Sequence, residues 1–335
     1  MHQRNTSLDF LRVIAVFAVV WLHVTTGVVI ANPDIHNMPW WTGNIANAFS
    51  RWCVPVFVMI SGALLFSPSA NLTPIEYYKK KAYRLLPPLF FWTLIYVLFQ
   101  EYTESTFTLK IAAASIISGS PYFHLWYLYM LVGLYFAIPF LRVMVSGIHS
   151  DSLRILIAGC FTIAAIESAL GRGSSTFPTF FLYFIGYFLS GHYLLSHPYN
   201  LNSRLLVSIF LVCGVFIAIG TGTLLPLLGP RSWEIMYSYQ NPIVIVMSLC
   251  IFLLFAKKEI AMSIPLGLFQ RIAPISLGVY AVHPLWLWFL AKFGVTGFLM
   301  HPLVGIPITT LIAFTLSVVS AALLTYIPFL RRTVC

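Results

Sequence analysis

The feature that most constrains this chain is a series of apolar runs, each long enough to predict a membrane-spanning helix. Ten such runs are predicted to cross the bilayer. Their connections are short, so residues 1–335 are predicted to form one all-α domain embedded in a membrane. The predicted spans are residues 8–30, 52–67, 85–102, 122–141, 154–171, 177–195, 204–224, 242–256, 272–292 and 302–328.

The scarcity of charge supports a membrane environment. Apolar residues make up 59% of the chain and charged residues only 8%, whereas an ordinary soluble domain contains about 25% charged residues. So few charges could not cover the surface of a soluble fold, which argues against soluble enzymes, nucleic-acid-binding domains and disordered tails. The first apolar run carries Arg12 and His23 and is too long for a cleavable signal peptide.

The basic residues predict the orientation. With both termini in the cytoplasm, thirteen basic residues fall inside and five outside, a clear positive-inside bias. This bias accounts for most of the net charge of +10, so no nucleic-acid partner is expected. The inner set is Arg4, Lys79, Lys80, Lys81, Arg84, Arg142, Arg154, Arg204, Lys257, Lys258, Arg271, Arg331 and Arg332. The outer set is Arg51, Lys110, Arg172, Arg231 and Lys292.

The apolar segment 111–119 could form a further span. If it did, every later loop would change sides and the excess of basic residues inside would vanish. We therefore predict a short interfacial or re-entrant piece on the outer face.

The first predicted span contains two residues that a lipid-facing helix would not favour. Arg12 and His23 are eleven residues apart, which places them on one helical face, about 20° apart in rotation and about 16.5 Å apart along the axis. Asp9 is spaced for pairing with Arg12 and for a capping box with Thr6. Snorkelling of Arg12 and a bond from His23 to another helix are the simpler interpretations. Their shared face suggests instead a polar track from the cytoplasm.

A basic cluster precedes the third predicted span. Lys79, Lys80, Lys81 and Arg84 lie before Pro87 and Pro88, which suit the first turn of a helix. A positive-inside anchor would explain the cluster. A site for a polyanion, such as nucleotide phosphates, is the functional alternative.

Other polar and aromatic residues lie within or beside the spans. Ser61, followed by Gly62, is more typical of close helix packing than of chemistry. His124 and Trp126 could belong to an interfacial belt, and Glu167 could be solvated. His283 precedes Pro284, which frees a backbone carbonyl. The five scattered cysteines match neither a disulfide framework nor a zinc pattern, and no metal is expected.

Taken together, these segments resemble the membrane-bound acyltransferase family 3, the bacterial integral-membrane O-acyltransferases. The most specific element is LDFLRVIAVFAVVWLHV, with Arg12 and His23 in the family's spacing. The supporting segments are RWCVPVFVMISGALLF, YYKKKAYRLLPP, HLWYLYMLVGLYFAIPFLR and SLGVYAVHPL. Lys81-x-x-Arg84 replaces an Arg-x-x-Arg frequent in the family. Charge is kept, but bidentate phosphate binding by the first residue is lost. The chain resembles members without a fused soluble esterase-like domain.

The resemblance implies acetyl transfer from cytoplasmic acetyl-CoA, with His23 as general base or as a transient acyl carrier. The base route is favoured, because a relay needs a second base that the sequence does not identify. Arg12 and the basic cluster Lys79, Lys80, Lys81 and Arg84 would hold acetyl-CoA. The acceptor would be a hydroxyl of a lipid-linked or cell-surface glycan outside a bacterial inner membrane, with lipids around the protein. The candidate acceptor-side residues are Arg51, Ser61, His124, Trp126, Glu167 and His283.

Two alternatives come from other functional classes. A transporter or flippase would move a small molecule or glycolipid without consuming acetyl-CoA. A glycolipid-binding regulatory protein would use His23 only for a bond between helices. Neither alternative requires Arg12, His23 and the basic cluster together.

Overall fold

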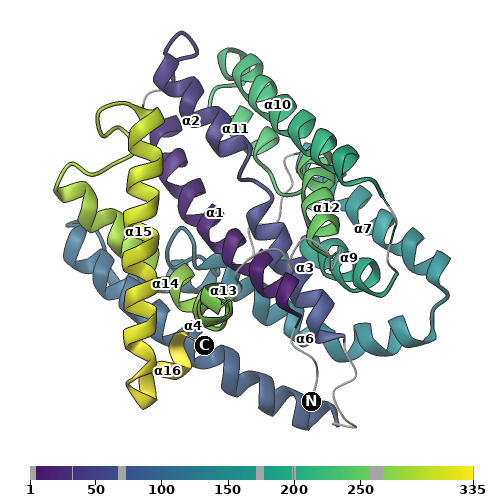
Figure 1. The fold of residues 1–335 in the computed structure, drawn as a ribbon. Helices are drawn as coiled ribbons and strands as arrows, with labels where there is room; N and C mark the ends of the chain where they lie inside the picture. The colour runs from purple at the N-terminus through teal and green to yellow at the C-terminus, as the bar shows by residue number, and fades with distance from the viewer. Residues whose placement is uncertain are drawn as a thin grey trace.

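The computed structural model describes residues 5–31, 33–66, 73–170, 177–197, 199, 201–256 and 267–334. Among these residues no strand occurs, which confirms the all-α prediction (Figure 1). Arg4, Arg172, Lys257, Lys258 and Cys335 lie outside the described residues. The helices are α1 (Thr6–Ala31), α2 (Met38–Ala48), α3 (Cys53–Leu65), α4 (Pro74–Thr103), α5 (Leu109–Ile117), α6 (Trp126–Gly147), α7 (Ser150–Ala169), α8 (Phe177–Phe180), η1 (Phe181–Phe184), α9 (Ile185–Ser196), α10 (Ser203–Leu228), α11 (Arg231–Met236), α12 (Pro242–Ala256), α13 (Gly267–Ile272), η3 (Ala273–Ile275), α14 (Ser276–Lys292), α15 (Pro302–Thr325) and α16 (Pro328–Val334).

Eight helical segments in the described part of the chain are long and apolar enough to cross a membrane. They correspond to eight of the ten predicted spans. The predicted span 242–256 forms the shorter helix α12, of 15 residues. The predicted span 177–195 is divided among α8, η1 and α9. The chain is therefore a multi-pass membrane protein whose interior combines long helices with shorter, broken ones.

The second membrane segment begins earlier than predicted. It runs from Met38 to Leu65 and includes α2, whereas the prediction began at residue 52 and placed Arg51 in an outer loop. Arg51 lies at the junction of α2 and α3 and is only 9% exposed. The asparagines of α2 masked its apolar pattern. They are buried because neighbouring segments satisfy them: Asn44 Nδ2 donates to Ala218 O at 2.9 Å.

The basic cluster lies on a helix and not in a loop. The helix α4 begins at Pro74, eleven residues before the predicted start at residue 85, after a capping box between Thr73 and Glu76. Pro87 and Pro88 therefore lie inside this helix and not in its first turn. The early start places Lys80 and Arg84 one helical turn apart, on one face of α4.

The helices α3 and α9 approach each other at two glycines. A Cβ atom on Gly62 would lie 1.8 Å from the carbonyl oxygen of Phe188, and one on Gly191 would lie 1.9 Å from the carbonyl oxygen of Met59. Neither position has room for a side chain. Gly62 thus has the packing role that the sequence predicted.

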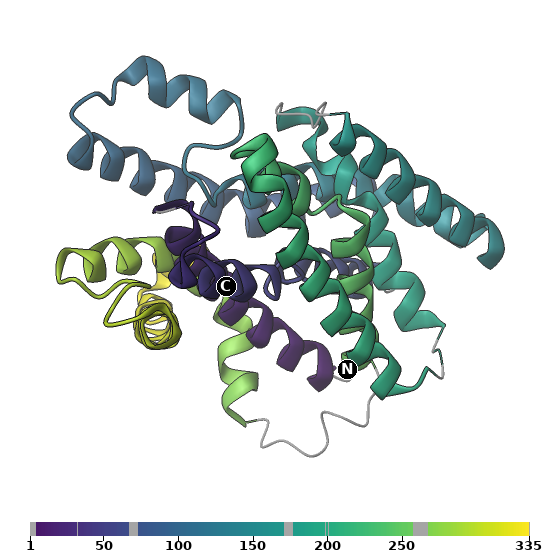
Figure 2. The ribbon, with the colours of Figure 1, turned by 90° about the horizontal axis from the view of Figure 1, so that it is seen from above.

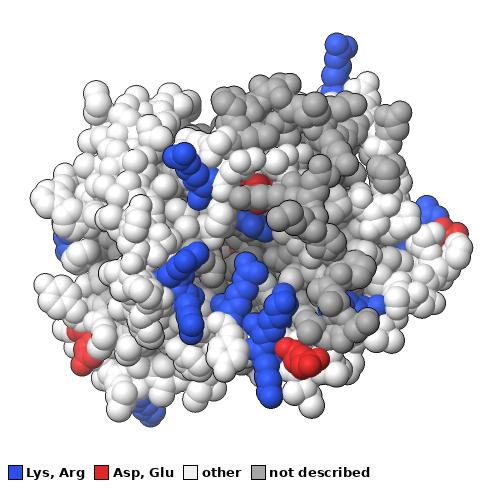
Figure 3. All heavy atoms as spheres, turned by 60° about the horizontal axis from the view of Figure 1, so that its bottom comes forward, with Lys and Arg blue, Asp and Glu red and all other residues white. Residues whose placement is uncertain are grey.

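Both ends of the described chain lie at the same end of the molecule (Figure 1). We call this the basic end, because Lys79–Lys81, Arg84, Arg331 and Arg332 belong to it. Figure 3 turns it toward the viewer and shows Lys and Arg gathered there, with fewer Asp and Glu. The start of α2 and the short helix α11 lie at the opposite end (Figure 1).

The segment 111–119 overlaps α5, a helix of nine residues. Such a helix rises only about 13 Å, which is less than the thickness of a bilayer core. Figure 2 shows it at the margin of the molecule, beyond the C-terminal part of α4. This length favours a segment that does not span the bilayer, and its placement as an interfacial or re-entrant piece on the outer face stays a prediction.

Candidate functional site

Three histidines from separate parts of the chain meet inside the helical bundle. His23 of α1 stacks on His283 of α14, with ring centroids 5.1 Å apart. His124, which precedes α6, lies 5.5 Å from the His283 ring. His124 and His283 are 1% and 0% exposed, whereas His23 is only partly buried. We call these residues the histidine cluster. No group suited to a metal ion occurs among the described His, Cys, Asp and Glu residues.

Pro284 helps to orient His283. Proline has no N–H, so the carbonyl of Tyr280, four residues earlier, loses its usual helical donor. The Nδ1 atom of His283 lies 2.6 Å from this carbonyl oxygen and must donate to it, because a carbonyl only accepts. A neutral His283 therefore carries its lone pair on Nε2. That atom is buried and has no hydrogen-bond partner among the described residues.

Tyrosines hold α14 in place beside the cluster. Tyr96 of α4 donates to the carbonyl of Ala281 at 2.6 Å, and Tyr280 donates to the carbonyl of His124. These bonds join α14 both to α4 and to the segment that carries His124. The histidine rings are therefore supported by a hydrogen-bonded frame as well as by packing.

A cavity of about 250 Å³ extends from the basic end toward the cluster, and we call it the inner cavity. Arg12, Lys81 and Arg84 line it together with Ser61 and three tyrosines, and no acidic side chain is among its described lining residues. Arg12 also lies 3.8 Å from Asp9. Three cations in a confined space repel one another, so the inner cavity suits an anionic group.

Tyr280 connects the inner cavity with the histidine cluster. Its ring lines the cavity, and its centroid lies 5.3 Å from that of His124 and 6.0 Å from that of His283. Arg12 thus lines the inner cavity, and His23 lies in the cluster on the other side of Tyr280. A polar track that joins the two along α1 stays a prediction.

A second cavity opens at the opposite end, and we call it the outer pocket. It has a volume of about 460 Å³, and its lining includes Thr26, Arg51, Trp233, Tyr237 and Gln240. The guanidinium carbon of Arg51 lies 3.9 Å from the centre of the Tyr237 ring. The indole Nε1 of Trp233 is buried and has no hydrogen-bond partner among the described residues.

Arg51 also connects the outer pocket with α1. Its Nε donates to Asn47 Oδ1 at 2.7 Å, and Asn47 Nδ2 donates to the hydroxyls of Thr25 and Thr26 at 3.0 and 2.9 Å. These threonines follow His23 within one helical turn. Arg51 and Asn47 therefore fix the part of α1 on which His23 lies.

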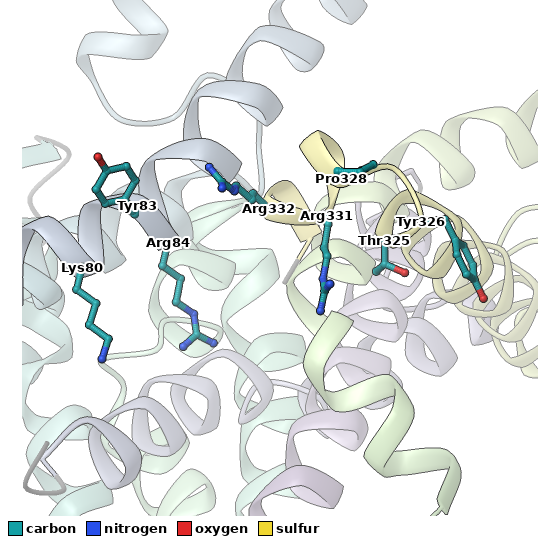
Figure 4. Close-up of a pocket in the computed structure, with 8 residues that line it drawn as sticks. All are labelled: Lys80, Tyr83, Arg84, Thr325, Tyr326, Pro328, Arg331 and Arg332. Atoms are coloured by element: carbon teal, nitrogen blue, oxygen red, sulfur yellow. The ribbon is translucent and has the colours of Figure 1, made fainter.

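Three sequence candidates are not part of the histidine cluster and line neither the inner cavity nor the outer pocket. Lys79 is exposed and lines neither the inner cavity nor the outer pocket. Trp126 packs against Phe180 and Phe184, with ring centroids 5.2 and 5.7 Å away. Glu167 lies on α7, whereas α1, α14 and the segment before α6 carry the cluster. Lys80 lines a separate open groove at the basic end (Figure 4).

Tyr280 and Asn47 were not predicted from the sequence. Tyr280 precedes His283 by three residues, and Asn47 precedes Arg51 by four. These are helical spacings that place side chains on one face. The signal for Tyr280 was visible in SLGVYAVHPL, but Asn47 lay in a segment predicted as a loop.

Comparison with known proteins identifies the family of the chain. The family model described as an acyltransferase domain, of acyltransferase family 3, matches residues 5–327 of the 335. Neither the curated proteins nor the solved structures include a significant match to the chain. Because the family match extends over nearly the whole chain and includes Arg12, His23 and His283, the protein belongs to the membrane-bound acyltransferase family 3.

Proposed function

We propose that this acyltransferase moves an acetyl group from acetyl-CoA, bound at the basic end, to a hydroxyl group that arrives from the opposite end. The observation that carries the proposal is the inner cavity. Arg12, Lys81 and Arg84 line it without an acidic neighbour in its described lining, and Tyr280 joins it to the histidine cluster.

The donor side follows from these charges. Lys81 and Arg84 suit the phosphates of CoA, because cations make strong charge-assisted bonds to phosphate oxygens. The pantetheine arm would pass Arg12 and bring the thioester to His23. Arg12 would position the donor and not transfer a proton, because a guanidinium stays protonated.

In the base route, neutral His23 removes the proton of the acceptor hydroxyl as its oxygen attacks the thioester carbonyl. The new C–O bond forms and the C–S bond breaks. CoA leaves as a thiolate and takes the proton back from the imidazolium of His23. The products are the acetyl ester and CoA, and His23 is neutral again.

The relay route has a candidate for the second base that the sequence did not identify. In this route His23 first takes the acetyl group, and the acceptor hydroxyl then attacks the acyl-imidazole. His283 stacks on His23, and its Nε2 lone pair has no partner among the described residues. It could take the hydroxyl proton in that second step.

For the acceptor, the outer pocket supports a sugar. It combines flat aromatic surfaces, Trp233 and Tyr237, with the polar side chains of Arg51 and Gln240. Such a mixture suits a ring with an apolar face and several hydroxyl groups. A lipid-linked or cell-surface glycan outside a bacterial inner membrane is the acceptor class that we propose.

The direct test measures acetyl transfer by purified protein in lipid nanodiscs. Labelled acetyl-CoA is supplied with candidate glycans, and both acetylated product and released CoA are followed. His23→Asn should lower the rate by about 10²–10⁴-fold. His149→Asn is the matched control, because His149 is an exposed helix cap and asparagine also caps helices.

Transfer by His23→Asn at the wild-type rate would disprove the catalytic role. Movement of the glycan across the membrane without release of CoA would favour the transporter instead. Labelled acetyl that stays on denatured wild-type protein, but not on His23→Asn, would identify the relay route.

A further inference from the structure

An open basic groove lies between α4 and the C-terminal helix α16. Its volume is about 940 Å³. Lys80 and Arg84 come from α4, and Arg331 and Arg332 come from α16. Figure 4 shows Lys80, Arg84 and Arg331 extending to the same side, while Arg332 extends toward α4. No acidic side chain is among the described residues that line it.

The arginines of α16 are held on a docked helix. Thr333 and Val334 are 1% and 0% exposed, and the indole Nε1 of Trp92 donates to the carbonyl of Thr333 at 2.9 Å. A Cβ atom on Gly278 would lie 2.6 Å from Cβ of Val334, so α14 and α16 are in close contact. This packing fixes where Arg331 and Arg332 leave the helix.

Arg84 joins the groove to the inner cavity, because it lines both. One elongated ligand could therefore place a polyanionic head in the open groove and extend a narrow arm past Arg84 into the inner cavity. The groove also offers two exposed aromatic side chains, Tyr83 and Tyr326, which are 74% and 83% exposed. Their ring faces are available to a flat heterocycle.

We propose that this groove binds the phosphorylated adenosine of CoA, with Arg331 and Arg332 holding its 3′-phosphate. This inference rests on the proposed function. The guanidinium groups suit a phosphate that is recognised by two parallel hydrogen bonds, which a lysine cannot supply. The C-terminal helix would then complete the donor site, and the pair Lys81 and Arg84 would serve the diphosphate at the mouth of the inner cavity.

The test compares three donors in nanodiscs made only of zwitterionic lipid. The donors are acetyl-CoA, its dephospho form, which lacks the 3′-phosphate, and acetyl-pantetheine, which lacks every phosphate. Arg331→Gln/Arg332→Gln should weaken the binding of acetyl-CoA by roughly tenfold or more. Binding of the dephospho form should change little, and turnover of acetyl-pantetheine should equal the wild-type rate, which shows that the inner cavity is intact.

The matched control is Arg204→Gln, an exposed arginine in the first turn of α10, which should leave the binding of all three donors unchanged. Equal loss of affinity for acetyl-CoA and its dephospho form would overturn the 3′-phosphate assignment. Unchanged affinity of the double variant for acetyl-CoA would overturn the proposal that the groove binds any part of CoA. If the double variant altered only the effect of added anionic lipid, the ligand would be a lipid headgroup. No binding of acetyl-CoA to the wild-type protein would instead refute the proposed function.

Discussion

At the scale of residues, the hydrogen bond from His283 to the carbonyl of Tyr280 forms because Pro284 has no backbone N–H. Pro284 leaves that carbonyl without its helical donor, and Nδ1 of His283 takes the position at 2.6 Å. The helix thus lacks one backbone hydrogen bond, and the side-chain bond that replaces it fixes the orientation of the His283 imidazole. Irregular backbone is tolerated inside a membrane protein when other groups satisfy it.

The first prediction concerns Pro284→Ala. Alanine restores an N–H that competes for the Tyr280 carbonyl, so His283 loses its fixed orientation. We expect the acetyl-transfer kcat to fall at least about tenfold, while the melting temperature stays the same or rises because a helix-interior proline is removed. Steady-state kinetics and thermal unfolding of the same preparation measure both quantities.

Pro307→Ala is the control, because Pro307 also lies inside a helix, α15, but is exposed. It should leave kcat unchanged. A Pro284→Ala variant with full activity would show that the orientation of His283 has no part in the reaction.

At the scale of elements, the pair α3 and α9 is built on close backbone approach. Ser61 of α3 lines the inner cavity, and Gly62, the next residue, has no room for a side chain against Phe188. Small residues at helix interfaces let backbones approach in this way. The packing of α3 against α9 therefore also places one wall of the inner cavity.

The second prediction compares two glycine substitutions. Gly62→Ala should destabilise the protein by about 1–3 kcal/mol, because an added methyl forces the two helices apart. Gly159→Ala is the matched control: Gly159 lies inside α7, and a Cβ atom there would have nothing within 4 Å. It should be neutral or slightly stabilising. Thermal unfolding in detergent measures both, and equal melting temperatures would contradict the close approach.

At the scale of the whole molecule, two cavities at opposite ends lie on either side of the histidine cluster. Tyr280 lines the inner cavity and lies beside His283, and the outer pocket includes Thr26, one helical turn beyond His23. A donor and an acceptor could thus arrive from opposite sides of a membrane without crossing it. This arrangement requires the basic end to face the cytoplasm.

The third prediction tests that orientation with single cysteines in a background without the native ones. Ser105 lies in the connection between α4 and α5, and Ser203 is the first residue of α10; both are exposed. In intact cells, a maleimide that does not cross membranes should label Ser105→Cys and should reach Ser203→Cys only after permeabilisation. If α5 crossed the membrane, both variants would react in intact cells.

The sequence by itself determined that this protein lies in a membrane, that it is all-α, and where most of its membrane segments are, and it singled out Arg12 and His23 as candidates on one helical face. These follow from local properties, because the hydrophobicity and rotation of one helix depend only on neighbouring residues. The resemblance to the family added the expectation of acyl transfer. The sequence pattern failed where polar residues are satisfied by distant partners. The pattern predicts a loop at α2, because it does not show that Asn44 bonds to Ala218 or that Asn47 bonds to Thr25 and Thr26.

Only the tertiary structure decided which candidates share a site. It brought His124 and His283 to His23, left Glu167 and Trp126 outside the cluster, and separated Lys79 from the cation pair Lys81 and Arg84. It also placed Arg331 and Arg332 across a groove from Lys80. The physical reason is that a site is formed by packing between helices, and the contacts that select each pairing lie far apart along the chain.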